Sequence, residues 1–116
     1  MDYEIGKPRT FFPLPGVELT DMGWIKLMPD EQITFKTETR RNDIVRKAWG
    51  FYLGNSLNAT LRNQGFKTAL VVSHASSPPR LFINLVEQDK LDQFSDYLSE
   101  VNAEVACWLD EWLKTS

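Results

Sequence analysis

The sequence predicts a small α+β domain, and three observations lead to this class. The 116 residues are 42% hydrophobic, which is typical of a globular protein and too apolar for general disorder. Apolar residues alternate with period two in several segments, which indicates strands, and recur at helical spacing in others. A chain of this length can bury roughly two-thirds of the surface that its unfolded form exposes, so it can fold without a metal or a disulfide.

Residues 1–20 are expected to form an extended arm. This segment contains three prolines and two glycines, a pattern that opposes both helix formation and regular strand pairing. Phe11 and Phe12 are expected to dock in a groove of the same domain or of a neighbour, because exposed aromatic residues tend to be covered. The predicted organisation is this arm followed by a single α+β domain over residues 21–116.

Residues 24–36 alternate between apolar and polar side chains on both sides of a turn at Pro29, which predicts a β-hairpin. The polar residues 38–42 then form a second connection. Residues 43–47 are expected to pair back as a third strand, and a short helix through the same stretch is the alternative.

A short helix is predicted for residues 56–64. Ser56 is a good N-terminal cap, and Gly65 is expected to take the left-handed conformation that ends a helix. The aromatic stretch 49–52 lies where this helix is expected to begin. Residues 69–72 and 81–86 follow as two apolar strands, joined by a turn-rich loop into a second hairpin.

A second helix is predicted to start at Asp89, because apolar residues recur at helical spacing as far as Val101. Residues 103–113 fit two structures. Alternating apolar residues favour a last strand, whereas a continued helical stripe would extend the helix. We prefer the strand, because Asn102 can end a helix and an unbroken helix would be long for so small a domain.

The expected order is therefore strand, helix, strand, strand, helix, strand. That order predicts a small two-layer, ferredoxin-like sandwich (βαββαβ) with an extra N-terminal β-hairpin and the extended arm. This fold hosts enzymes, regulators and assembly subunits, so it says little about function.

The net charge of −3 is unevenly distributed. Residues 36–67 contain seven basic and two acidic side chains, whereas residues 81–116 contain two basic and eight acidic ones. Such segregation permits head-to-tail association or an anionic partner on the basic side. Two solvated faces are the alternative interpretation.

Cys107 is the only cysteine, so no intramolecular disulfide can form. The lone thiol, the acidic first residues and the lack of a long apolar run predict a cytoplasmic protein with neither a signal peptide nor a membrane span. His74 is the only histidine. We therefore expect no metal site and no cofactor, and no residue is assigned a catalytic role.

Two sets of residues are candidates for binding. The stretch 40–52 interleaves basic and aromatic side chains, as single-stranded nucleic-acid platforms do, although core aromatics beside a solvated basic loop would give the same pattern. Its candidate binding residues are Arg40, Arg41, Arg46, Lys47, Trp49, Phe51 and Tyr52. The candidate interface residues are Phe11, Phe12, Trp108 and Trp112.

Five short segments carry a resemblance to uncharacterised small bacterial proteins associated with surface-polysaccharide gene clusters. These segments are DMGWI (21–25), EQITF (31–35), KAWGFY (47–52), SLN (56–58) and WLD (108–110). The resemblance covers most of the chain from residue 21 onward. It implies a bacterial setting and nothing about mechanism.

The sequence thus predicts a non-enzymatic protein-binding or accessory domain that acts through protein contacts and self-associates, most simply as a homodimer. A small anion- or single-stranded nucleic-acid-binding module on residues 40–52 is the alternative, and a small enzyme that uses His74 is the third hypothesis. The expected partner is a protein or a second copy of the chain. No membrane partner is expected, and nucleic acid is a partner only in the alternative.

Overall fold

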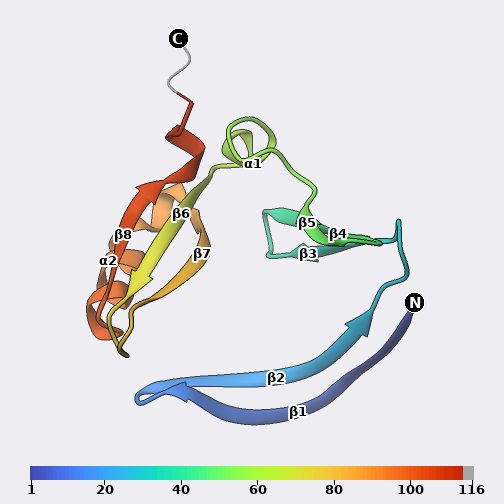
Figure 1. The fold of residues 1–116 in the computed structure, drawn as a ribbon, viewed down its shortest axis with the longest axis horizontal. Coiled ribbons are helices and arrows are strands. Elements are labelled where there is room, and N and C mark those ends of the chain that lie inside the picture. The colour runs from blue at the N-terminus through green and yellow to red at the C-terminus, as the bar shows by residue number, and fades with distance from the viewer. Residues whose placement is uncertain (114–116) are drawn as a thin grey trace. The chain divides into compact units, whose positions relative to one another are not determined.

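The structure is a computed structural model that describes residues 1–113, and most of these residues lie in strands (Figure 1). The strands form three small antiparallel sheets, ordered β1-β2, β3-β4-β5 and β7-β6-β8. The chain divides into two compact units, Met1–Gly54 (unit 1) and Asn55–Ser116 (unit 2). Each unit is described by itself.

The prediction of a ferredoxin-like α+β sandwich is wrong. That fold needs one sheet whose strands alternate with two covering helices. Here β5 (Gly50–Leu53) pairs with its sequence neighbour β4 in unit 1 and does not join the sheet of unit 2. The first helix, α1 (Thr60–Asn63), has only four residues, which is too short to cover a sheet. The result is three small sheets with few helices.

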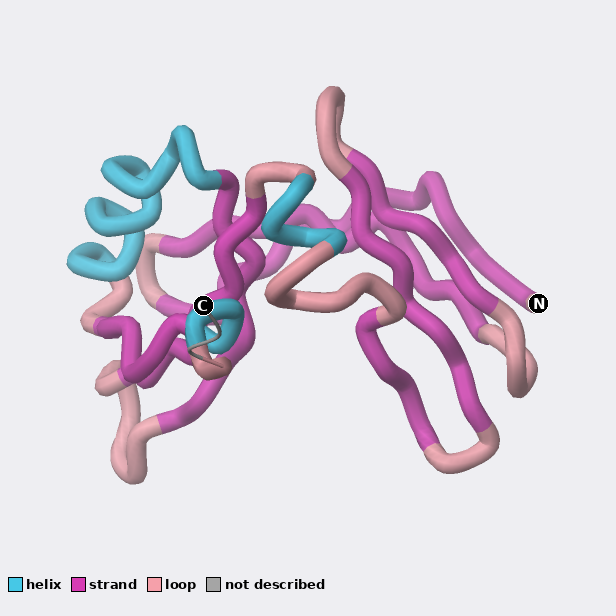
Figure 2. The backbone as a smooth tube through the Cα atoms, turned by 90° about the horizontal axis from the view of Figure 1, so that it is seen from above, coloured by secondary structure: helices cyan, strands magenta, loops and turns pink. Residues whose placement is uncertain are grey.

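The segment expected as an extended arm, residues 1–20, supplies the first strand and the start of the second. β1 (Asp2–Leu14) and β2 (Val17–Lys26) form a long antiparallel hairpin, which Figure 1 shows as two neighbouring strands, and Figure 2 colours the strands of the chain magenta. The prolines fit because the ladder is interrupted around them. Pro8 lies in the register shift between Ile5 and Arg9, and Pro13 lies in a second shift, where a missing N–H disturbs no ladder.

The remaining sheet of unit 1 is a meander of β3 (Gln32–Lys36), β4 (Arg41–Lys47) and β5. The predicted third strand is confirmed, because Ile33 pairs with Ile44 across β3 and β4. The pairing predicted for residues 24–36 is wrong. β2 ends at Lys26 and takes β1 as its partner, so the turn at Pro29 connects two different sheets.

Unit 2 contains most of the elements that the sequence predicted. The helix expected at residues 56–64 is shorter than predicted and begins at Thr60, with Ala59 at the N-cap position in place of Ser56. The Ser56 hydroxyl still accepts a hydrogen bond from the Thr60 N–H (2.8 Å), and Gly65 follows the helix with φ +88°, as expected. The hairpin of β6 (Phe66–Ser73) and β7 (Arg80–Glu87) is confirmed.

The second helix and the last strand are also confirmed. A 3₁₀ turn, Gln88–Lys90, leads into α2 (Leu91–Glu100), and Asn102 follows it in the left-handed region with φ +55°. β8 (Ala103–Trp108) then pairs with β6, and a second 3₁₀ turn, Leu109–Glu111, comes after it.

The core of unit 2 lies between α2 and one face of its sheet. Figure 1 shows α2 against this sheet. Ala69 and Val71 of β6 pack with Leu98 of α2, and the half-buried side chains packed around them are Phe94, Ala103, Val105 and Trp108. Because side chains alternate along a strand, Leu70 and Val72 project from the opposite face. The helix therefore covers one side of the sheet.

Candidate functional site

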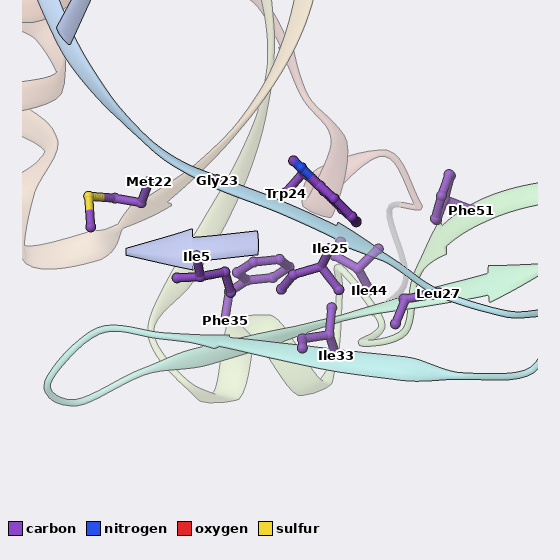
Figure 3. Close-up of a pocket in the computed structure, with 10 residues that line it drawn as sticks. All are labelled: Ile5, Met22, Gly23, Trp24, Ile25, Leu27, Ile33, Phe35, Ile44 and Phe51. Atoms are coloured by element: carbon purple, nitrogen blue, oxygen red, sulfur yellow. The ribbon is translucent and has the colours of Figure 1, made fainter. Parts of the chain in front are cut away.

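An apolar pocket lies in unit 1 between the β1–β2 hairpin and the three-stranded sheet (Figure 3). Its volume is about 350 Å³. None of the lining residues has a charged side chain, and the single polar group is the indole N–H of a tryptophan. They are Ile5, Met22, Gly23, Trp24, Ile25, Leu27, Ile33, Phe35, Ile44 and Phe51.

The pairing register of the three-stranded sheet explains which of its side chains line the pocket. Ile33 and Ile44 are direct partners, so their side chains lie on the same face of the sheet. Phe35 is two residues further along β3 and therefore joins them on that face. Phe51 belongs to the same face, because it pairs with Arg46, two residues after Ile44. Apolar side chains from all three strands thus line one side of the pocket.

The β1–β2 hairpin contributes lining residues at a point where its two strands approach each other closely. Gly23 pairs with Ile5 and has φ +129°. A β-carbon built on Gly23 would lie 1.8 Å from the carbonyl oxygen of Glu4, well inside contact distance. Only glycine therefore fits at this point, both for its backbone conformation and for the space available.

Two carboxylates fix the backbone at the edges of the pocket. Asp21 accepts hydrogen bonds from the Gly23 N–H (2.9 Å) and from Arg9 (3.1 Å), and these bonds lower the pKa of its carboxyl group. Glu31 accepts a bond from the Met28 N–H (2.7 Å), which lowers the pKa of Glu31. The two carboxylates therefore hold the backbone of β2 and of the loop after it, and neither belongs to the lining.

Several lining side chains are open to solvent in addition to forming the pocket wall. Trp24 is 53% exposed and Phe51 62% exposed, whereas Leu27 is buried. Large aromatic side chains beside an apolar hollow are the groups that most often anchor protein interfaces. The arrangement can bury an apolar segment, and it offers no side chain for acid–base chemistry.

The predicted binding stretch is divided between the two faces of its sheet. Arg46 and Phe51 are direct partners on the pocket face, where the guanidinium lies 5.7 Å from the ring centre. Lys47 and Tyr52 belong to the opposite face by strand alternation. Trp49 stacks on Tyr52, with ring centres 6.0 Å apart and planes 18° apart. The aromatic side chains therefore do not form one continuous platform.

The basic side chains of this stretch are also spread out. Arg40 ends the turn between β3 and β4, and Arg41 is the first residue of β4. Lys47, at the other end of β4, forms an ion pair with Asp30, which raises the pKa of the lysine. The structure thus places Arg46 on the pocket face of the sheet, beside the lining residue Phe51, and leaves the other basic residues elsewhere.

The predicted interface residues have different environments. Phe12 is exposed, whereas Phe11 is half-buried with the Arg9 guanidinium 5.3 Å above its ring. Trp108 packs into the core of unit 2 against Phe94, and Trp112 is 71% exposed. Trp108 therefore has a structural role within its own unit.

His74 lies outside the pocket. Its ring nitrogen is 3.4 Å from a carboxylate oxygen of Glu104, and both side chains are largely exposed. Within residues 1–113, no three histidine, cysteine, aspartate or glutamate side chains gather as metal ligands would. In the same part of the chain, no helix is long and apolar enough to cross a membrane.

Comparison of the chain with protein-family models, curated proteins and solved structures finds no match. The pocket is therefore interpreted from its own residues.

Sequence reasoning missed the contribution of the hairpin to this pocket. Ile5 and Met22 fall in or beside a segment that was expected to be an arm. The alternation of residues 33 and 35 did indicate an apolar face, but the partner of that face could not be read from the pattern.

Proposed function

We propose that the protein is a non-enzymatic protein-binding domain that self-associates, and that the pocket of unit 1 receives an apolar segment of a partner protein. A cytoplasmic location, based on the lone Cys107, is part of the same proposal. The resemblance to bacterial proteins of surface-polysaccharide gene clusters stays a prediction.

The apolar lining of the pocket is the observation that carries this proposal. Small-molecule sites usually combine apolar walls with several placed polar groups that orient the ligand. Here the indole of Trp24 is the only polar side-chain group among ten lining residues. An apolar side chain on a partner's backbone needs no such groups, because the partner's own chain fixes its orientation.

The hairpin supports the same conclusion. A two-stranded hairpin is at best marginally stable in water unless a face is covered. Its exposed large apolar residues are Tyr3, Ile5, Phe12, Leu19, Met22 and Trp24. A bound segment that covers the pocket side of the hairpin would remove several of these side chains from water and stabilise the pairing of β1 with β2.

Panning a random peptide library against the immobilised full chain tests the pocket. We expect enriched peptides to carry large apolar residues, because these fit the lining. Met22→Ser and Phe51→Ser should weaken binding of the selected peptides about tenfold or more, since both side chains are exposed lining residues whose loss removes apolar contact.

Leu19→Ser is the matched control. Leu19 is on the same hairpin and 47% exposed, close to the 50% of Met22, but it does not line the pocket. The control should bind the peptides as the wild-type chain does. Failure to enrich any peptide, or equal losses for the Leu19 and Met22 variants, would contradict the assignment of the pocket.

A further inference from the structure

β7 is an edge strand that lacks the features by which edge strands usually avoid pairing. It is the outer strand of the β7-β6-β8 sheet, and among residues 1–113 only β6 pairs with it. Natural edges are commonly interrupted by a bulge, a proline or a charge in mid-strand. β7 pairs with β6 without a register shift over eight residues, and its six central residues are uncharged.

The other edge of the same sheet provides a comparison. β8 has six residues, its register with β6 shifts between Leu70 and Val71, and the exposed charge of Glu104 lies within it. This edge is therefore short, irregular and charged. The contrast identifies β7 as the edge open to a further strand.

The side chains of β7 point to the same conclusion. Leu81, Phe82 and Ile83 are consecutive and are 64%, 54% and 56% exposed. Leu81 and Ile83 project from the face of the sheet opposite α2, beside Val72 and Leu70 of β6. An uninterrupted edge with exposed apolar residues on both faces is a template for strand addition.

The order of side chains along β7 selects the occupant and its direction. A two-fold axis perpendicular to the sheet returns each face to itself, so the odd-numbered residues of β7 meet the odd-numbered residues of a second, antiparallel copy. On the face opposite α2 these residues are Leu81, Ile83 and Leu85, all apolar. A second copy therefore meets this apolar row with an identical one.

We propose that two copies of the chain pair antiparallel through β7, joining the three strands of each copy into one six-stranded sheet. A two-fold axis perpendicular to the sheet at Ile83 places each Ile83 opposite its counterpart and Leu81 opposite Leu85 of the second copy. These apolar pairs then form one continuous row on the face opposite α2. This inference rests on the self-association in the proposed function and names its surface.

Sedimentation velocity of the full chain from about 1 to 100 µM tests the proposal. We expect a dimer whose dissociation constant rises tenfold or more in Ile83→Lys, because the two lysines would meet at the axis. Tyr97→Lys is the matched control. It adds the same charge to an exposed position of the same unit, on α2, and should leave the dimer intact.

A pair of charged variants provides a second test, of the register itself. Leu81→Lys and Leu85→Glu should each weaken the dimer, because each places a charge against a leucine of the other copy. The double variant brings opposite charges together across the interface and should recover part of the affinity. Circular dichroism confirms that every variant is folded.

The possible results separate this inference from the proposed function. A dimer that survives Ile83→Lys, Leu81→Lys and Leu85→Glu but dissociates in Met22→Ser would overturn the β7 interface and leave self-association standing. A wild-type chain that stays monomeric throughout the concentration range would overturn both.

Discussion

Unit 1 and unit 2 differ in how much of their apolar surface they bury. Within unit 1, all of whose residues the structure describes, Leu27 and Val45 are the only buried hydrophobic side chains. Unit 2 has a larger set, consisting of Leu61, Phe66, Ala69, Val71, Val86 and Leu98. The two units are similar in length, so chain length does not explain the difference.

The difference follows from layering. A sheet buries a face only when a second layer covers it. In unit 2, α2 supplies that layer over β6 and β8, whereas unit 1 consists of a two-stranded and a three-stranded sheet without a helix. Unit 2 therefore buries an apolar core under α2, whereas unit 1 leaves more of its large apolar side chains exposed.

The largest effect is expected from the core of unit 2. Leu98→Ala should lower the free energy of unfolding by about 3 kcal/mol, because it opens a cavity between α2 and the sheet. Leu91→Ala, at a 37% exposed position of the same helix, should cost less than about 1 kcal/mol. Denaturant melts measure both values. Equal losses for the two variants would show that α2 does not form the core of this unit.

A smaller effect is expected from the hairpin of unit 1. Gly23→Ala places a β-carbon against the Glu4 backbone, so we expect the pairing of β1 with β2 to weaken by roughly 2 kcal/mol. Amide hydrogen exchange of these strands measures the change, and the amides of β6 should not respond.

Gly16→Ala separates the clash from the backbone conformation. Gly16 also has positive φ, but no atom lies within 4 Å of the added carbon. Its substitution should cost only about 1 kcal/mol, the price of the unfavourable φ alone. A larger cost at Gly16 than at Gly23 would refute the close approach of the two strands.

The smallest effect is expected when the pH is lowered, and it concerns the stability of the β1–β2 hairpin. Because the pKa of Asp21 is lowered in the folded hairpin, its stabilising contribution is present above the pKa of the unfolded chain and is lost as the pH falls through the folded value. We expect exchange in β1 and β2 to speed up relative to β6 between about pH 5 and pH 3. Asp21→Asn should remove that part of the pH dependence, and an unchanged profile would argue against the role of this carboxylate.

The sequence predicted unit 2 better than unit 1, and the reason is physical. In unit 2 the strong signals are local: Gly65 ends α1, Asn102 ends α2, and the turn-rich loop makes β6 and β7 a hairpin. In unit 1 the pattern revealed strands but not their partners. Alternation assigns residues to faces, whereas the choice between β1 and β3 as the neighbour of β2 depends on contacts distant in sequence.

The candidate site was harder to predict for the same reason. Phe51 and Arg46 were identified from composition, and the structure places both on the pocket face of the sheet. Ile5 gave no signal, because the prolines around it indicated an arm. The bulges that accommodate those prolines are a property of the paired hairpin and not of the single strand.

Hydrogen exchange of the full chain, with and without a selected peptide, tests the central claim most directly. The claim is that a partner segment covers the apolar pocket of unit 1, whereas α2 covers the core face of unit 2. Peptide binding should slow exchange of amides in β2, β3 and β5 around the pocket and leave β6 and α2 unchanged. Equal protection of both units in the unbound chain, or protection confined to unit 2 on binding, would contradict it.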